Sequence, residues 1–104
     1  MNKIKYIEQC LSDEIRTKSH LLDASEYEWF MHHAIKPQQI KVTTSPDAIC
    51  WKEVWLITDG NDNSVYKVVF DEDTESFGLI CTLDIGIEWY MGSYGNLVET
   101  IKSI

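Results

Sequence analysis

The sequence lacks the features that define several large classes of protein. It has no apolar run near the roughly 20 residues that a membrane-spanning helix needs, and its first residues do not form the apolar stretch of a signal peptide. Its three cysteines, Cys10, Cys50 and Cys81, stand far apart and form no C-x-x-C pair, which disfavours a disulfide framework. We therefore expect a cytoplasmic protein with reduced thiols and no membrane association.

Motifs for catalysis, cofactors and metals are also missing. The sequence contains no G-x-S-x-G and no glycine-rich phosphate loop. Two stretches, beginning at Asp59 and Asp71, resemble the first half of a calcium-binding loop, but both lack the glycine and the glutamate that the loop requires further on. The histidines and cysteines show no zinc-ligand spacing. We therefore expect no enzymatic activity, no cofactor and no metal site.

Basic residues are scarce in the second part of the chain, and this sets the charge. The net charge is −8. Residues 1–43 hold six basic and six acidic side chains, whereas residues 44–104 hold three lysines against eleven carboxylates. Phosphate contacts need clustered lysine or arginine, so direct binding to nucleic acid is disfavoured. A basic protein partner is favoured, because complementary potential speeds encounter.

The residues that are present predict a single domain over residues 1–104, of the α+β class. Apolar residues every three or four positions predict a helix over about residues 3–17. Asp23 followed by Glu26 is a capping-box pattern that begins a second helix, which we expect to end before Pro37. The face that this helix should bury consists of Tyr27, Phe30, Met31, Ala34 and Ile35.

Alternating and β-branched stretches then predict a meander of four or five strands. The stretches cover residues 39–44, 48–58, 64–71, 77–84 and 87–91. Short connections between consecutive strands favour antiparallel pairing, and apolar residues on both faces of the second strand predict that it is covered on both sides. A short helix follows, marked by Leu97, Val98, Ile101 and Ile104. We expect the helices to pack on one face of the sheet.

Carboxylates in and around the turns are the strongest functional signal. The stretch VVFDEDTESFGLI places four acids within five residues between two strands, where they repel one another. This turn and the turn at residues 59–63 lie at opposite ends of the strand predicted over residues 64–71. A solvated hairpin whose charge prevents edge aggregation is the alternative explanation. We predict binding of a basic partner by Asp59, Asp62, Asp71, Glu72, Asp73 and Glu75, with Asp84 and Glu88 as second choices.

Four large rings lie on the predicted strands. Most rings in such positions belong to the core. Trp89 and Tyr90 are neighbours on one strand, so they must point to opposite faces. An exposed ring among the acids would anchor a protein partner. The rings are Trp51, Trp55, Trp89 and Tyr90.

The stretch VWLITDGNDNSVYKVVFDEDTESFGLI, followed by a short strand and YGNLVETIKSI, resembles small bacterial immunity proteins of polymorphic toxin systems, including those of contact-dependent growth inhibition. The resemblance covers about residues 54–104 and names no contact residue. It implies an acidic cytoplasmic domain that binds one cognate toxin, often a basic nuclease, and blocks its active site or a neighbouring surface. Two alternatives stay open: a phage-encoded inhibitor that mimics nucleic acid against a host or defence protein, and a small hydrolase or nucleotide-binding domain.

Overall fold

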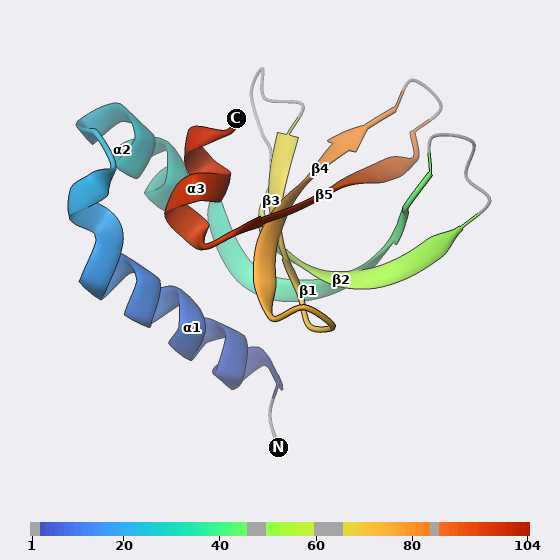
Figure 1. Ribbon diagram of the computed structural model, residues 1–104, viewed down its shortest axis with the longest axis horizontal. Coiled ribbons are helices and arrows are strands. Elements are labelled where there is room, and N and C mark those ends of the chain that lie inside the picture. Colours follow the sequence, from blue (N-terminus) through green and yellow to red (C-terminus); the bar gives the residue numbers. More distant parts are fainter. Residues whose placement is uncertain (1–2, 46–49, 60–65, 84–85) are drawn as a thin grey trace.

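The structure combines a helical layer with a meander of strands. It is a computed structural model that describes residues 3–45, 50–59, 66–83 and 86–104. The elements are α1 (Lys3–Lys18), a 3-10 turn η1 (Ser19–Leu21), α2 (Ala24–His33), β1 (Ala34–Thr43), β2 (Trp51–Thr58), β3 (Tyr66–Asp71), β4 (Ser76–Thr82), β5 (Glu88–Gly95) and α3 (Leu97–Lys102) (Figure 1). The predicted α+β class, the meander and the short C-terminal helix are confirmed. No helix in these described ranges is long and apolar enough to cross a membrane.

The five strands close into a barrel. Each strand pairs antiparallel with the next along the chain. A parallel pair between Thr43 of β1 and Trp89 of β5 completes the ring. The antiparallel meander was predicted from the sequence, but its closure was not. Because side chains alternate along a strand, closure gives every strand an inward and an outward set of side chains.

Two apolar cores follow from this alternation. The outer core lies between the helices and the outward side chains of the strands, and the inner core fills the barrel. As predicted, β2 is covered on both sides toward its end, because Trp55 and Ile57 belong to the outer core and Val54 to the inner one. The outer core contains Ile7, Phe30, Trp55, Ile57, Val68, Phe70, Phe77, Leu79, Leu97 and Ile101. The inner core contains Val42, Val54, Val69 and Ile80.

The second helix begins where the sequence predicts and ends earlier. Asp23 and Glu26 form the capping box, with reciprocal hydrogen bonds of 2.8 and 2.9 Å. The helix ends at His33, before Pro37 as predicted, but Pro37 does not stop it, because Pro37 is buried within β1. The β1–β2 ladder already begins at Ala34, so strand pairing ends the helix.

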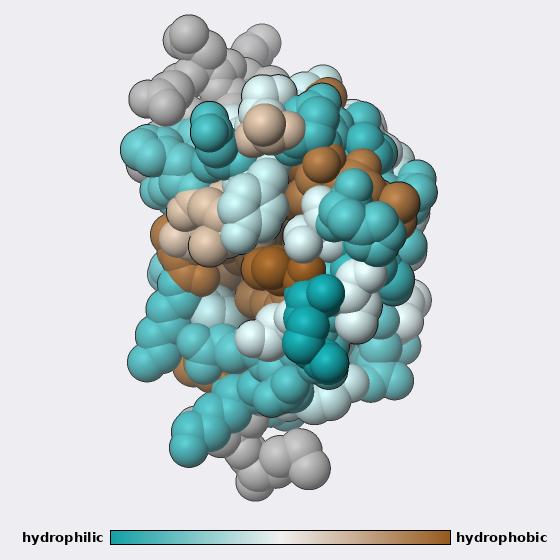
Figure 2. Space-filling view, turned by 90° about the vertical axis from the view of Figure 1, so that its left-hand side faces the viewer, coloured by the Kyte–Doolittle hydropathy of each residue, from teal (hydrophilic) through white to brown (hydrophobic). Residues whose placement is uncertain are grey.

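The buried face predicted for α2 was also wrong in part. Phe30 is buried, but Ala34 is exposed, and Tyr27 and Met31 are 38% and 50% exposed. The helix meets the rest of the protein through the side that carries Phe30 and His33, which leaves the opposite side uncovered. Figure 2 shows this helical side of the molecule, where apolar surface appears between hydrophilic residues.

Strand β5 is longer than predicted. It continues to Gly95, whereas the predicted strand ended at residue 91. Gly92 and Gly95 have positive φ values of 119° and 92°, which only glycine adopts without strain. The pairing register with β4 shifts between Leu79 and Ile80 and between Phe77 and Gly78. The glycines therefore serve as irregularities within the strand and do not end it.

Candidate functional site

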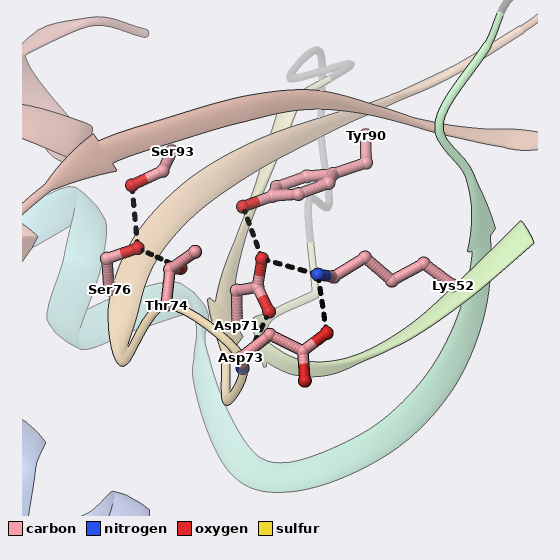
Figure 3. A network of polar contacts seen from close by, with 7 residues as sticks. All are labelled: Lys52, Asp71, Asp73, Thr74, Ser76, Tyr90 and Ser93. Carbon is pink, nitrogen blue, oxygen red and sulfur yellow. Dashed lines mark hydrogen bonds and ion pairs between the residues drawn. The ribbon is translucent and has the colours of Figure 1, made fainter.

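An ion pair between a buried carboxylate and a partly buried lysine lies where β3 turns into β4. Asp71 is the last residue of β3 and is 2% exposed. Its Oδ2 atom accepts a hydrogen bond from the Lys52 ammonium at 2.9 Å and one from the Tyr90 hydroxyl at 3.2 Å. Its Oδ1 atom accepts the backbone N–H of Asp73 at 3.0 Å. Asp71 thereby joins β2, β5 and the β3–β4 turn (Figure 3).

The surroundings fix the protonation states of Lys52 and Tyr90. Hydrogen bonds to Asp73 and Asp71 raise the pKa of the Lys52 ammonium, although partial burial opposes them. Burial raises the pKa of the Tyr90 hydroxyl, and the charge of Asp71 and its hydrogen bond to that hydroxyl add to the effect. At neutral pH the lysine is therefore charged, and the tyrosine is a neutral donor to Asp71.

Side chains of α1 and β2 hold the next two acids of the turn. Glu72 accepts a hydrogen bond from the indole N–H of Trp55 and pairs with Lys3 at 2.9 Å. These contacts, the Trp55 bond foremost, hold the pKa of Glu72 below its usual range. Asp73 pairs with Lys52 at 2.8 Å, which lowers the pKa of Asp73.

The far side of the turn is held by hydroxyl groups. Glu75 accepts a hydrogen bond from the Tyr6 hydroxyl of α1 and has a positive φ of 48°. The Ser76 hydroxyl lies 2.6 Å from the hydroxyls of both Thr74 and Ser93, which links the turn to β5 (Figure 3). The acidic turn is therefore tied to α1, β2 and β5, in contrast to a solvated loop whose charges only repel.

An open hollow of about 680 Å³ lies beside this turn. Its lining includes Trp51 and Glu53 of β2, Lys41 of β1, and Glu72 and Asp73 of the turn. Trp51 is 48% exposed, and the side chain of Asp73 is 77% exposed. We call this site the Trp51 hollow.

The structure divides the predicted partner-binding acids among several places. Glu72 and Asp73 line the Trp51 hollow, and Asp71 is buried beneath Asp73. Glu75, on the other side of the turn, faces α1. Asp62 and Asp84 lie outside the described residues.

The two remaining predicted acids lie away from the hollow. The Asp59 carboxylate is 3.0 Å from the Nδ1 atom of His33. Glu88 pairs with Lys67 at 2.9 Å and accepts a hydrogen bond from the Thr82 hydroxyl. The described members of the predicted set therefore do not form one continuous acidic surface.

Sequence reasoning missed Glu53 and the position of Trp51. Trp51, Glu53 and Trp55 alternate along β2 and so point to the same side of the strand. That spacing was available in the sequence, but it did not show that Trp51 is half-exposed while Trp55 is only 8% exposed. The difference arises because Trp55 packs in the outer core and bonds to Glu72.

Comparisons with known proteins give no match. No protein-family model matches the sequence, and searches of curated proteins and of solved structures find no similar chain. The function must therefore be inferred from the site itself.

Proposed function

We propose that this protein is a non-enzymatic, cytoplasmic binder of a cationic protein, and that the partner is a toxin of nuclease type, so that the protein acts as an immunity protein. The observation that carries the proposal is the internally fixed β3–β4 turn, which presents Glu72 and Asp73 beside the exposed ring of Trp51. Side chains that are already ordered lose less conformational entropy on binding. A large exposed ring next to charged groups has the composition of an interface centre.

The charge balance favours a basic partner. The net charge is −8, because acidic side chains outnumber basic ones. Within the part of the chain that the structure describes, six basic side chains form ion pairs with carboxylates. A nuclease must be cationic where it holds phosphate, so an inhibitor with excess carboxylates complements that surface.

The protonation behaviour of the described residues favours binding over catalysis. General acid–base catalysis works best with a pKa near the operating pH. Each shift that is resolved in the described residues moves the pKa away from neutrality: downward for the acids Asp13, Asp23, Glu26, Glu72 and Asp73, and upward for Lys52, Tyr6 and Tyr90. The acids and Lys52 are therefore suited to act as fixed charges, and Tyr6 and Tyr90 stay neutral.

The proposal is tested by isolating the partner from the native host and measuring its association with purified variants. The test variant is the double change Glu53→Gln and Asp73→Asn in the Trp51 hollow. The matched control is Glu8→Gln and Glu99→Gln, which removes the same charge from exposed positions on α1 and α3. The hollow variant should associate more slowly and dissociate faster than the control. The parent protein should also inhibit nuclease activity of the partner at equal molar ratio.

Two outcomes would contradict this proposal. Equal binding by both double variants would remove the Trp51 hollow from the interface. A tightly bound partner that is acidic, or that cleaves no nucleic acid, would exclude the nuclease-type toxin.

A further inference from the structure

We propose that the Trp51 hollow binds an arginine side chain of the partner, with its guanidinium group stacked on the Trp51 indole and held by the carboxylates of Glu53 and Asp73. The inference rests on the proposed function, because it names the contact that a cationic protein would make there.

The strand register places the ring and one carboxylate together. Trp51 lies opposite Thr43 and Glu53 lies opposite Lys41 in the β1–β2 ladder, so Trp51 and Glu53 share one side of β2. Residues two apart on a strand are separated by roughly 7 Å, which is within the reach of one long side chain. The half-exposed indole therefore has a carboxylate beside it.

Both proposed carboxylates have accepting capacity left. Among the described residues, the side chain of Glu53 makes no hydrogen bond or ion pair, and Glu53 is exposed. Asp73 is held by Lys52 through its Oδ2 atom, which leaves its Oδ1 atom without a contact in the same part of the chain. Glu72 differs, because one of its oxygens contacts Trp55 and the other contacts Lys3.

The local charge favours a cation over an anion. Three lysines line the hollow, but Lys3 is paired with Glu72, and Lys52 with Asp71 and Asp73. Lys41 is the lysine of the lining that has no ion pair among the described residues. With Asp71 counted beneath the turn, four carboxylates face three ammonium groups. A phosphate group would therefore meet two paired lysines, one lysine without an ion pair among the described residues, and an excess of carboxylates.

Arginine suits this arrangement better than lysine. The guanidinium group is planar, so it can stack on an indole while its edges donate hydrogen bonds to carboxylates in two directions. An ammonium group is a compact point charge that holds its water strongly and offers no flat face. Trp51 supplies the face, and Glu53 and Asp73 supply acceptors at its edges.

The test uses N-acetyl-arginine amide as the probe, with N-acetyl-lysine amide and pyrophosphate as comparisons. Binding is followed through the indole N–H signals of the tryptophans in isotope-labelled protein, with Trp51→Phe used to assign one signal. The arginine probe should shift the Trp51 signal saturably and bind more tightly than the lysine probe. Glu53→Gln and Asp73→Asn should each weaken binding about fivefold to tenfold, as expected when a charge-assisted hydrogen bond is lost. Glu8→Gln should leave it unchanged.

The result separates this inference from the proposed function. Equal binding of the two cationic probes, tighter binding of pyrophosphate, or no saturable shift would overturn the arginine site, even if the native partner still binds through the hollow. Conversely, Glu53→Gln and Asp73→Asn could weaken binding of the arginine probe and leave binding of the isolated partner unchanged. In that case the hollow would bind arginine, and the proposed interface would be wrong. The dispersion of each variant's spectrum shows that it is folded.

Discussion

The substitution Asp71→Asn tests whether Asp71 stabilises the fold as a buried acid, in contrast to the exposed acid Asp73. Asparagine keeps the shape of the side chain and removes its charge. Asp71 accepts hydrogen bonds from Lys52, Tyr90 and the backbone of Asp73, and it is 2% exposed. The same change at Asp73 is the matched control, because Asp73 contacts the same lysine but its side chain is 77% exposed.

The magnitude follows from burial. Removing one partner of a buried ion pair costs about 3–5 kcal/mol when the other charge is left alone. Lys52 keeps Asp73, and its side chain is 21% exposed, so we expect a loss at or below the lower end of that range. Asp71→Asn should therefore lower the free energy of unfolding by about 2–3 kcal/mol. Asp73→Asn should lower it by less than about 1 kcal/mol, as for an exposed pair.

Urea unfolding followed by tryptophan fluorescence measures both values. The slope of free energy against urea should not change, which would show that the two variants unfold the same surface. Small domains typically have a free energy of unfolding of about 5–15 kcal/mol. A loss of roughly 2–3 kcal/mol is a substantial share of that value, but it leaves the variant folded. Losses that agree within about 0.5 kcal/mol would show that burial does not distinguish the two acids, and Asp71 would then have no special structural role in the turn.

Other consequences of the structure can be measured with the same assay. A Cβ atom at Gly78 would clash with the backbone carbonyl oxygen of Gly92 and lie 2.8 Å from the ring of Tyr90, so Gly78→Ala should cost about 1–3 kcal/mol, and a loss below that range would contradict these close contacts. Because folding raises the pKa of Tyr90, its contribution to stability is complete below about pH 10 and falls as the pH rises further. The parent protein should thus lose more stability in alkali than Tyr90→Phe, and parallel curves would refute this. In a Tyr6→Phe background, Glu75→Gly should add about 1 kcal/mol by relieving the positive φ, whereas no gain would show that the backbone there is unstrained.

Features encoded by neighbouring residues could be read from the sequence. The capping box of α2 needs only Asp23 and Glu26, and both of its hydrogen bonds are present. The meander follows from short connections between apolar stretches, which leave consecutive strands few other partners. Barrel closure could not be read in this way, because it depends on the pairing of Thr43 with Trp89, which are far apart in the chain.

The candidate site was harder to predict because it depends on which way each acid points. The four acids of the turn look equivalent in the sequence, yet Asp71 points into the barrel, to the same side of β3 as Val69 of the inner core. Its partner Lys52 comes from another strand, and so does Glu53, which lines the hollow beside Asp73. Alternation along β3 could have identified Asp71 as inward-facing. Its pairing with Lys52 could not be predicted in this way, because it depends on how the strands are arranged in the fold.

Ion pairs within the protein are compatible with long-range attraction of a cationic partner. The ion pairs depend on short-range contacts, whereas the attraction depends on the net charge. Pairing Asp71 with Lys52 uses the short-range contacts of both groups, but it cannot change the net charge of −8. At physiological salt that charge acts over a Debye length of about 8 Å, so it sets the encounter rate and its dependence on salt. In the proposed interface, residence time depends on the side chains of the hollow that can still make contacts, which are Trp51, Glu53 and Asp73. Acids placed far from the hollow should therefore change the association rate alone, whereas acids in the hollow should change both rates.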